Sequence, residues 1–215
     1  RSLDIDDVCK AISNHEAELL PTTPSFLNML ILSNKHKEYD LSSLKVISFG
    51  TEPMSDYLLE AVRDNFPDVQ LKQTYGMSEV GILQNYTNPN DPNYFKLKDT
   101  MKVEDGRLYI KSPMAMVGYL DNENIIDEEG WLDTGDIVEE KNGYIRVLGR
   151  AGDMINVGGM KVFPAEVENI ILRVDNVEDV IVFGKSNPLL GSIVACKVKL
   201  IQQEDERAEG RRGGK

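Results

Sequence analysis

The sequence predicts a mixed α/β and α+β fold built from three successive blocks, and three observations support this prediction. Helix-like and strand-like segments alternate over residues 1–85, which is typical of part of a layered α/β domain. Two Asx-Gly dipeptides between apolar runs predict a small antiparallel sheet or β-barrel over residues 86–148. A helix followed by two strands predicts a small α+β domain over residues 149–200, and the charged, Gly-rich residues 201–215 have the composition of a disordered tail.

The first block is predicted from the spacing of its apolar residues and from one helix cap. Apolar residues between Ile5 and Ile12 stand at i, i+3, i+4 and i+7, which places them on one face of a helix. Thr22 or Thr23 can cap the next helix, because Pro24 fits the first turn. The predicted elements are a helix at 5–12, a strand at 17–20, a helix from Pro24, a strand at 44–49, a helix at 55–66 and a strand at 69–75.

The later blocks are predicted from turn signals. Asp105-Gly106 separates apolar runs at 101–103 and 108–110, and Asn142-Gly143 separates runs at 137–140 and 144–148. Both dipeptides favour two-residue hairpin turns, in which both central residues need a positive φ. In the third block we expect a helix after Pro164, followed by strands at 179–183 and 193–200.

Composition excludes several classes of protein. The 215 residues are 41% hydrophobic and carry a formal charge of −12, so most of the chain can form a core and nonspecific nucleic-acid binding is disfavoured. No apolar run approaches the roughly 18 residues of a membrane span. Two cysteines and two histidines provide neither a disulfide framework nor metal-ligand spacing. We therefore expect a cytoplasmic protein, and an excerpt of a longer chain because it opens at Arg1 without a signal peptide.

Four short segments carry residue types suited to chemistry. They are, in chain order, Ser48-Phe49-Gly50-Thr51-Glu52-Pro53, Gln73-Thr74-Tyr75-Gly76-Met77-Ser78-Glu79, Trp131-Leu132-Asp133-Thr134-Gly135-Asp136, and the run 149–168. In the first two segments Gly50 and Gly76 follow predicted strands, and ligands of layered α/β folds bind beyond the carboxyl ends of strands. Glycine lets the backbone approach a flat ring closely, and Tyr75 can stack on that ring.

Three charged residues complete a set of candidate partners for a nucleotide. Glu79 offers a hard oxygen ligand for Mg²⁺, Asp136 can accept both hydroxyls of a ribose, and Arg150 presents a charged fork to phosphate oxygens. Each has a structural alternative: Glu79 as a solvated loop acid, Asp136 as a turn-closing residue and Arg150 as a surface ion-pair partner.

Other residues of these segments have their own structural alternatives. Tyr75 can instead be a core aromatic residue, and Trp131 is expected to serve packing. Glu166 and Glu168 fall in the first turn of the helix after Pro164, where acidic side chains favour the helix dipole.

The four segments together resemble the adenylate-forming superfamily of acyl- and aryl-CoA synthetases, luciferases and nonribosomal peptide adenylation domains. The family string Tyr-Gly-x-Thr/Ser-Glu is matched at 75–79, Thr/Ser-Gly-Asp at 134–136, and Gly-Arg-x-x-Asp through Pro-x-Glu-Val-Glu at 149–168. The resemblance covers about residues 1–200. It implies ATP-dependent activation of a small carboxylic acid as acyl-adenylate, then transfer to the thiol of CoA or of a carrier-protein phosphopantetheine.

The resemblance also implies a role for each matching residue. Glu79 is the implied Mg²⁺ ligand and catalytic residue, Lys161 a second catalytic residue near AMP, and Gly152 stands at the hinge of a mobile small domain. Gly158 and Gly159 match the loop beside the thiol tunnel. The implied nucleotide-binding residues are Gly50, Thr51, Glu52, Gln73, Thr74, Tyr75, Gly76, Ser78, Asp136 and Arg150.

The sequence departs from the family pattern in three places. It contains neither the Ser/Thr/Gly-rich phosphate loop that precedes these motifs nor the Lys of the terminal Pro-x-Thr-x-x-Gly-Lys motif, and Gly152 replaces a polar hinge residue. We therefore expect a fragment of an acid–thiol ligase, closer to CoA ligases than to peptide-synthetase domains and inactive by itself. The alternative is a noncatalytic nucleotide- or adenylate-binding module with the same fold.

Overall fold

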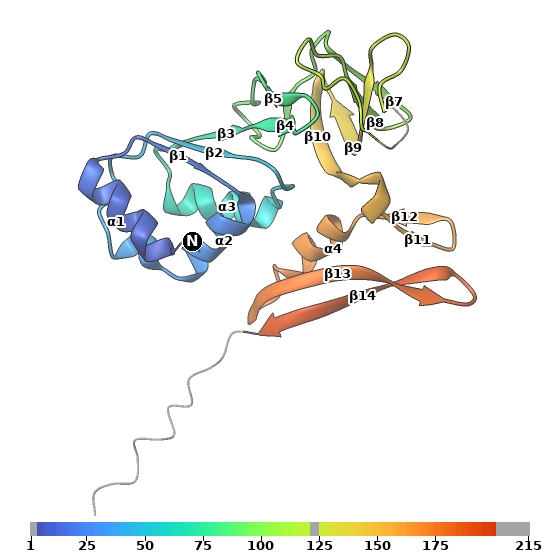
Figure 1. The fold of residues 1–215 in the computed structure, drawn as a ribbon. Coiled ribbons are helices and arrows are strands. Elements are labelled where there is room, and N and C mark those ends of the chain that lie inside the picture. Colours follow the sequence, from blue (N-terminus) through green and yellow to red (C-terminus); the bar gives the residue numbers. More distant parts are fainter. Residues whose placement is uncertain (1–3, 121–124, 201–215) are drawn as a thin grey trace, which may run out of the picture.

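The computed structural model describes residues 4–120 and 125–200 of the chain (Figure 1). The first block is a parallel three-stranded sheet in the order β1-β2-β3, with its helices packed on one face. Residues on that face of the strands alternate with more exposed ones, so Leu20, Ile47 and Leu71 enter the core. The elements are α1 (Ile5–His15), β1 (Leu19–Thr22), α2 (Pro24–Leu32), a 3₁₀ turn (Lys35–Lys37), β2 (Val46–Phe49), α3 (Asp56–Asn65) and β3 (Gln70–Gln73).

Helix starts in this block follow the capping residues of the sequence. Thr23, and not Thr22, caps α2 by accepting a hydrogen bond from the Phe26 amide at 3.2 Å. Ser55 caps α3 in the same way, accepting from the Leu58 amide at 3.1 Å. The predicted strand at 69–75 ends early, because the chain leaves the parallel sheet after Gln73 and joins a different sheet.

The second block is an open antiparallel sheet in the order β6-β10-β9-β8-β7, and a separate two-stranded ladder of β4 and β5 packs on its core. The prediction of a barrel is wrong: β6 and β7 are the two edges, and no pairing in the described residues joins them. Closing a sheet needs strands of matched length and stagger, whereas β6 has only two residues. The elements are β4 (Tyr75–Met77), β5 (Gly81–Leu83), β6 (Phe95–Lys96), β7 (Met101–Glu104), β8 (Arg107–Ile110), β9 (Leu132–Lys141) and β10 (Tyr144–Arg150).

Both predicted hairpins are present. Asp105 and Gly106 adopt φ of 50° and 77°, and Asn142 and Gly143 adopt φ of 53° and 76°, as a two-residue turn with two left-handed residues requires. The first turn joins β7 to β8 and the second joins β9 to β10. The Asx-Gly dipeptide in each turn therefore determines the hairpin connection from local sequence.

The third block is a four-stranded antiparallel sheet in the order β12-β11-β14-β13, covered by one helix. The predicted helix begins at Pro164 itself, and both predicted strands are longer than expected. The short β11–β12 hairpin was not predicted. The elements are a 3₁₀ turn (Ala151–Asp153), β11 (Ile155–Val157), β12 (Met160–Val162), α4 (Pro164–Ile171), β13 (Val177–Asn187) and β14 (Gly191–Leu200).

Two sequence-based expectations concern other parts of the chain. The tail at 201–215 lies outside the described residues. In the part that the structure describes, every helix is too short or too polar to cross a bilayer.

Candidate functional site

A cavity of about 240 Å³ lies where β2 and β3 end and β9 and β10 pass beside them. It brings together nine of the ten residues that the family resemblance assigned to nucleotide binding, and only Ser78 is absent from its lining. The lining residues are Gly50, Thr51, Glu52, Pro53, Gln73, Thr74, Tyr75, Gly76, Asp136, Val147, Gly149, Arg150 and Asp153. Pro53, Val147, Gly149 and Asp153 are additional lining residues to which the resemblance assigned no role.

The side chain of Asp136 is the most buried charge of this cavity and is held from both sides. Its carboxylate accepts a 2.5 Å hydrogen bond from the Tyr75 hydroxyl at one oxygen and pairs with Arg150 Nε, 3.0 Å away, at the other. Asp136 is 9% exposed in this pair, whereas Arg150 is 57% exposed. The site therefore has one fixed buried anion and one cation that solvent can reach.

Burial governs the protonation of this group. Desolvation raises the pKa of Asp136 above its ordinary value, and the Tyr75 hydrogen bond and the Arg150 charge oppose that rise. Burial and the neighbouring Asp136 charge also raise the pKa of Tyr75 far above its ordinary value. Tyr75 therefore remains a hydrogen-bond donor, and it also stacks on Phe95 in the core with ring centroids 5.3 Å apart.

The pairing of β9 with β10 places Arg150 directly opposite Asp136. Starting from the Asn142-Gly143 turn, the register is regular as far as Val147, which faces Val138. A bulge then shifts the ladder so that Gly149 faces Ile137. Without that extra residue Arg150 would lie opposite Gly135, so the bulge is what aligns the two charges.

The glycines at the strand ends are required by close packing of the chain itself. A Cβ on Gly50 would lie 2.4 Å from Thr74 Oγ1 and 2.5 Å from the Thr74 carbonyl oxygen. A Cβ on Gly76 would lie 2.6 Å from the Gly81 carbonyl oxygen. Thr51, next in the chain, adopts a left-handed φ of 71°, a conformation that strained sites often hold.

Glu79 lies beside a second cavity of about 510 Å³, and Arg150 lines both cavities. The Glu79 Oε1 atom accepts a 2.6 Å hydrogen bond from the Tyr119 hydroxyl, and this bond is the main cause that lowers the pKa of Glu79. Tyr119 was not predicted, and nothing in its local sequence signalled the contact. A single ionised carboxylate could contribute to holding Mg²⁺, which takes one or two carboxylates and completes its shell with phosphate and water oxygens. Among the described residues no cluster of three acidic, His or Cys side chains offers a different metal site.

Four residues of the third block to which the resemblance assigned roles lie outside the cavity at the ends of β2 and β3. Gly158 and Gly159 form the turn of the β11–β12 hairpin and Lys161 lies on β12, all exposed. Gly152 is exposed in the 3₁₀ turn between β10 and β11, without a positive φ. None of the four lines the cavity in this arrangement.

Several residues of the four segments make structural contacts. Glu166 lies in the first turn of α4 as expected, whereas Glu168 lies beyond that turn. The Glu168 carboxylate accepts the Val182 amide at 2.8 Å, which ties α4 to β13. Trp131 packs under the ammonium groups of Lys102 and Lys111, 4.9 and 5.7 Å from its ring. Glu52 accepts two hydrogen bonds from Ser25, one from its amide and one from its hydroxyl, at the start of α2.

The fold and this site define a class of protein. Residues 1–120 match the family described as AMP-binding enzyme, and residues 153–210 match the AMP-binding enzyme C-terminal domain. The first match alone covers more than half of the chain. The chain therefore belongs to the AMP-binding enzyme family.

Curated relatives agree with this family and show how much of a related protein the chain covers. The chain is 32% identical to a methyl-dioxo-octahydroindenyl-propanoyl:CoA ligase of Mycobacterium tuberculosis, a match that covers 86% of this chain and 39% of the relative. It is 32% identical to Acyl-CoA synthetase 7 of Caenorhabditis elegans, with 91% and 40% covered. It is 35% identical to luciferin 4-monooxygenase of Nipponoluciola cruciata, with 85% and 37% covered. The chain thus spans about 40% of the length of these relatives.

Solved structures share the fold. The anthranilate CoA ligase AuaEII in complex with anthranoyl-AMP superposes with a TM-score of 0.81 at 23% identity, covering 94% of this chain and 43% of that one. The amide bond synthetase McbA of Marinactinospora thermotolerans gives a TM-score of 0.78 at 24% identity, with 94% and 46% covered.

Proposed function

We propose that this chain is the middle and early C-terminal part of an ATP-dependent acid–CoA ligase that activates a carboxylic acid as its acyl-adenylate. The observation that supports this most strongly is the convergence of Tyr75, Asp136 and Arg150 on one cavity. These residues come from β4, β9 and the end of β10, and their arrangement suits the sugar and phosphate of a nucleotide. Family membership and the CoA ligases among the relatives support the same reaction class.

Asp136 supplies the anchor for the ribose in this proposal. The Tyr75 hydroxyl and Arg150 each contact one oxygen of the Asp136 carboxylate and hold its orientation. Each oxygen keeps a second lone pair, so the carboxylate can still accept hydrogen bonds from both hydroxyls of a vicinal diol. The Arg150 side chain is more than half exposed and lines the cavity, so it can change rotamer to contact the α-phosphate. The volume of about 240 Å³ suits the nucleoside part of the ligand.

Glu79 is the residue that would hold Mg²⁺. The metal, when bound, neutralises charge on the phosphate oxygens as the α-phosphate is attacked. Tyr119 keeps the Glu79 carboxylate oriented and ionised through its 2.6 Å hydrogen bond. Arg150 contributes a second positive charge next to the same cavity.

The reaction has two steps in this proposal. A carboxylate oxygen of the acid attacks the α-phosphorus of ATP, and pyrophosphate leaves. The CoA thiol then loses its proton to solvent and its sulfur bonds to the acyl carbon, while the bond from that carbon to the bridging oxygen breaks and AMP leaves with that oxygen. Gly158 and Gly159 are the proposed passage for pantetheine, Lys161 a proposed contact of AMP, and Gly152 the proposed pivot between the two steps. A carrier protein is the alternative acceptor of the acyl group.

A noncatalytic nucleotide-binding module is the second candidate. Such a module would bind nucleotide at the Asp136 site but would not catalyse acyl-adenylate formation. The experiment that separates the two is an acid panel with the full-length parent, scored by ATP-dependent AMP release with and without CoA. We expect release with at least one acid, stimulated by CoA. A parent that binds ATP but releases no AMP with any acid would favour the binding module.

A further inference from the structure

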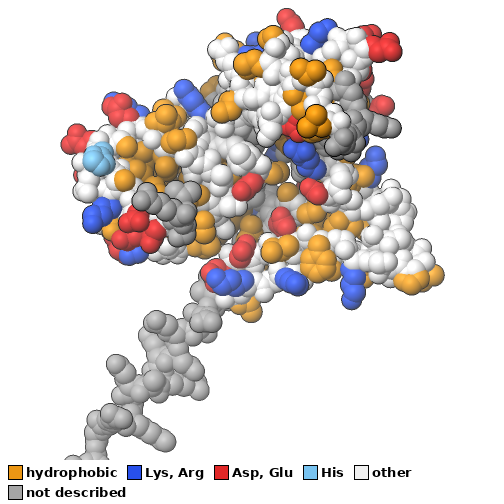
Figure 2. All heavy atoms as spheres, in the orientation of Figure 1, with side chains coloured by type: hydrophobic (Ala, Val, Ile, Leu, Met, Phe, Trp, Pro, Cys, Tyr) orange, Lys and Arg blue, Asp and Glu red, His pale blue; other side chains and the backbone are white. Residues whose placement is uncertain are grey.

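A cavity of about 450 Å³ lies where the third block meets the first. The cavity is lined by residues of α2, α3, β10 and α4. In the space-filling view, acidic side chains gather in the middle of this face, where the blocks meet (Figure 2). The acidic lining residues are Glu52, Asp56 and Glu139 on one side and Glu166, Glu168 and Asp179 on the other. The lining also includes Arg146 and Asn169, and specific polar bridges made by these side chains join the blocks around the cavity.

The first bridge is a helix cap supplied by a different block. The second residue of α3, Tyr57, has an amide without a partner inside its own helix. That amide donates to Asn169 Oδ1 of α4, at 3.1 Å. The next amide, that of Leu58, donates instead to Ser55 within the same helix. Asn169 thus completes the cap of α3 across 112 positions of sequence.

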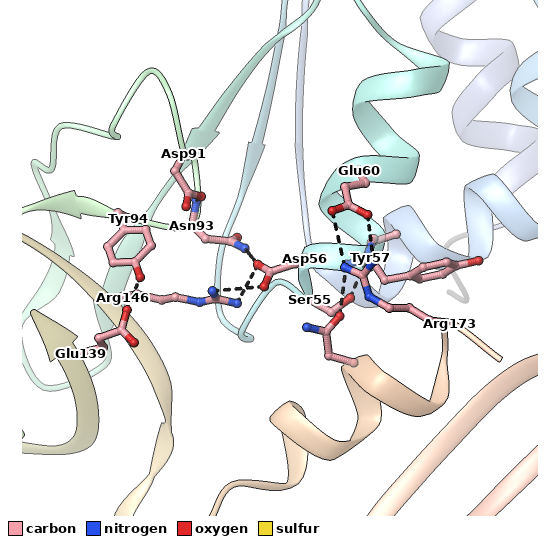
Figure 3. Close-up of polar contacts among 12 residues, drawn as sticks. Ser55, Asp56, Tyr57, Glu60, Asp91, Asn93, Tyr94, Glu139, Arg146 and Arg173 are labelled. Atoms are coloured by element: carbon pink, nitrogen blue, oxygen red, sulfur yellow. Dashed lines mark hydrogen bonds and ion pairs between the residues drawn. The ribbon is translucent and has the colours of Figure 1, made fainter. Parts of the chain in front are cut away.

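The second bridge lies about one turn further along α3 and just past the end of α4. Arg173, just after α4, reaches Glu60 of α3 with both terminal nitrogens: Nη1 lies 3.2 Å from one carboxylate oxygen and Nη2 3.4 Å from the other (Figure 3). Residues 57 and 60 are neighbours on the surface of α3, as 169 and 173 are on the adjoining turns of chain. Two parallel contacts fix an orientation, whereas one contact would leave a free rotation.

The start of α3 also anchors the second block. Asp56 pairs with Arg146 of β10 at 2.8 Å and accepts a hydrogen bond from Asn93 at 2.9 Å (Figure 3). Arg146 lies four residues before Arg150 on the same strand. The first turns of α3 therefore contact both other blocks, one on each side of the helix.

We propose that Asn169 and Arg173 are positioning residues that form a breakable latch, holding the third block against α3 in the arrangement in which the β11–β12 hairpin lies outside the nucleotide cavity. Solvent reaches both side chains of the ion pair, which are 47% and 60% exposed, so the contact is weak enough to open. For catalysis, which rests on the proposed function, release of this latch is the step that lets Gly158, Gly159 and Lys161 approach the nucleotide.

Amide exchange on the 215-residue chain tests the latch without any activity measurement. In Asn169→Ala the Tyr57 amide loses its acceptor, so its exchange rate should rise about fivefold to tenfold. The Leu58 amide, bonded within α3, should keep its rate and serves as the internal control. Glu166→Ala, on the same helix, is the matched control variant and should leave both amides unchanged. Unchanged Tyr57 exchange in Asn169→Ala would overturn the proposal.

A distance measurement tests whether the latch sets the arrangement of the blocks. Spin labels on the exposed Cys196 and on an introduced Asp64→Cys report the separation of β14 from α3, since Cys9 is buried. Arg173→Glu should broaden or shift this distance distribution, and the charge-reversed double variant Glu60→Arg/Arg173→Glu should restore it. A distribution that is the same in wild type and Arg173→Glu, or a double variant that fails to restore it, would contradict the latch.

Discussion

At the scale of single residues, Asp136, the proposed ribose anchor, is a buried charge that opposes the stability of the fold. The same burial that makes its carboxylate a directional acceptor raises its pKa, because the charged form loses hydration. Arg150 is more than half exposed and offsets little of this cost. Binding, and not stability, is the reason to keep such a buried charge. Replacing it with a neutral group should therefore increase the free energy of unfolding.

We expect Asp136→Asn to raise the unfolding midpoint by about 2–4 °C at neutral pH, for a gain on the order of 1 kcal/mol, while weakening nucleotide binding. Because the folded pKa lies above the ordinary 3.8, the folded chain binds the proton more tightly than the unfolded chain. Wild-type stability from this group therefore falls as pH rises from about 3.8 through the raised pKa.

Thermal unfolding of both proteins between pH 3.5 and 7.5 measures the difference. The midpoint of Asp136→Asn minus that of wild type should grow from near zero at the acid end to a plateau above the raised pKa. A difference that shrinks with rising pH would show that ionised Asp136 stabilises the fold.

Glu79→Gln in the full-length parent should lower the rate of pyrophosphate exchange by about 10²-fold at moderate Mg²⁺, because a carboxamide is a poor ligand for this ion. Tyr119→Phe is the matched control: it removes the 2.6 Å hydrogen bond but keeps the carboxylate, so its Mg²⁺ requirement should shift less. Superimposable Mg²⁺ titrations of wild type and Glu79→Gln would exclude the metal role.

At the scale of secondary-structure elements, local sequence signals determine some strand positions, and contacts between distant residues determine others. The Asn142-Gly143 turn sets the start of the β9–β10 ladder, and a bulge between Val147 and Gly149 sets its end. Only the two together bring Arg150 opposite Asp136. The strand ends at Gly50 and Gly76 depend instead on how closely neighbouring segments approach.

Gly76→Ala should destabilise the chain by about 1–3 kcal/mol, because its Cβ would overlap the backbone of Gly81 and Ile82 at 2.6 and 2.8 Å. Gly152→Ala is the matched control, since a Cβ there meets nothing within 4 Å and its φ is not positive. It should change stability by less than about 0.5 kcal/mol. Urea unfolding midpoints measure both, and equal midpoints would show that β4 and β5 can separate without cost.

At the scale of the whole molecule, the chain spans about 40% of the length of its curated relatives and carries part of the proposed nucleotide site. Tyr75, Asp136 and Arg150 are in place, and Arg150 connects two adjacent cavities. The Ser/Thr/Gly-rich phosphate loop and the terminal catalytic lysine of the family are not part of this sequence. We therefore expect this chain to retain nucleotide binding and to lack catalysis.

The 215-residue chain should catalyse no measurable ATP–pyrophosphate exchange with any acid. Loss of one group that stabilises transition-state charge typically costs ~10²–10³ in rate, and two such groups are lacking here. The measurement is exchange of labelled pyrophosphate, with a cooperative thermal transition as evidence that the protein is folded. Exchange near the rate of the full-length parent would refute this expectation.

The sequence by itself determined the elements whose signals are local. Apolar spacing and a threonine cap at Thr22 or Thr23 predicted the helices, and the two Asx-Gly turns predicted the hairpins, because each rests on residues within a few positions of one another. Tertiary structure alone decided that the second sheet stays open, that Tyr119 binds Glu79, and that Asn169 caps α3. The two hydrogen bonds join residues that are 40 and 112 positions apart in the sequence, and whether the sheet closes depends on the lengths of its edge strands. No pattern within a few residues of sequence predicts such contacts.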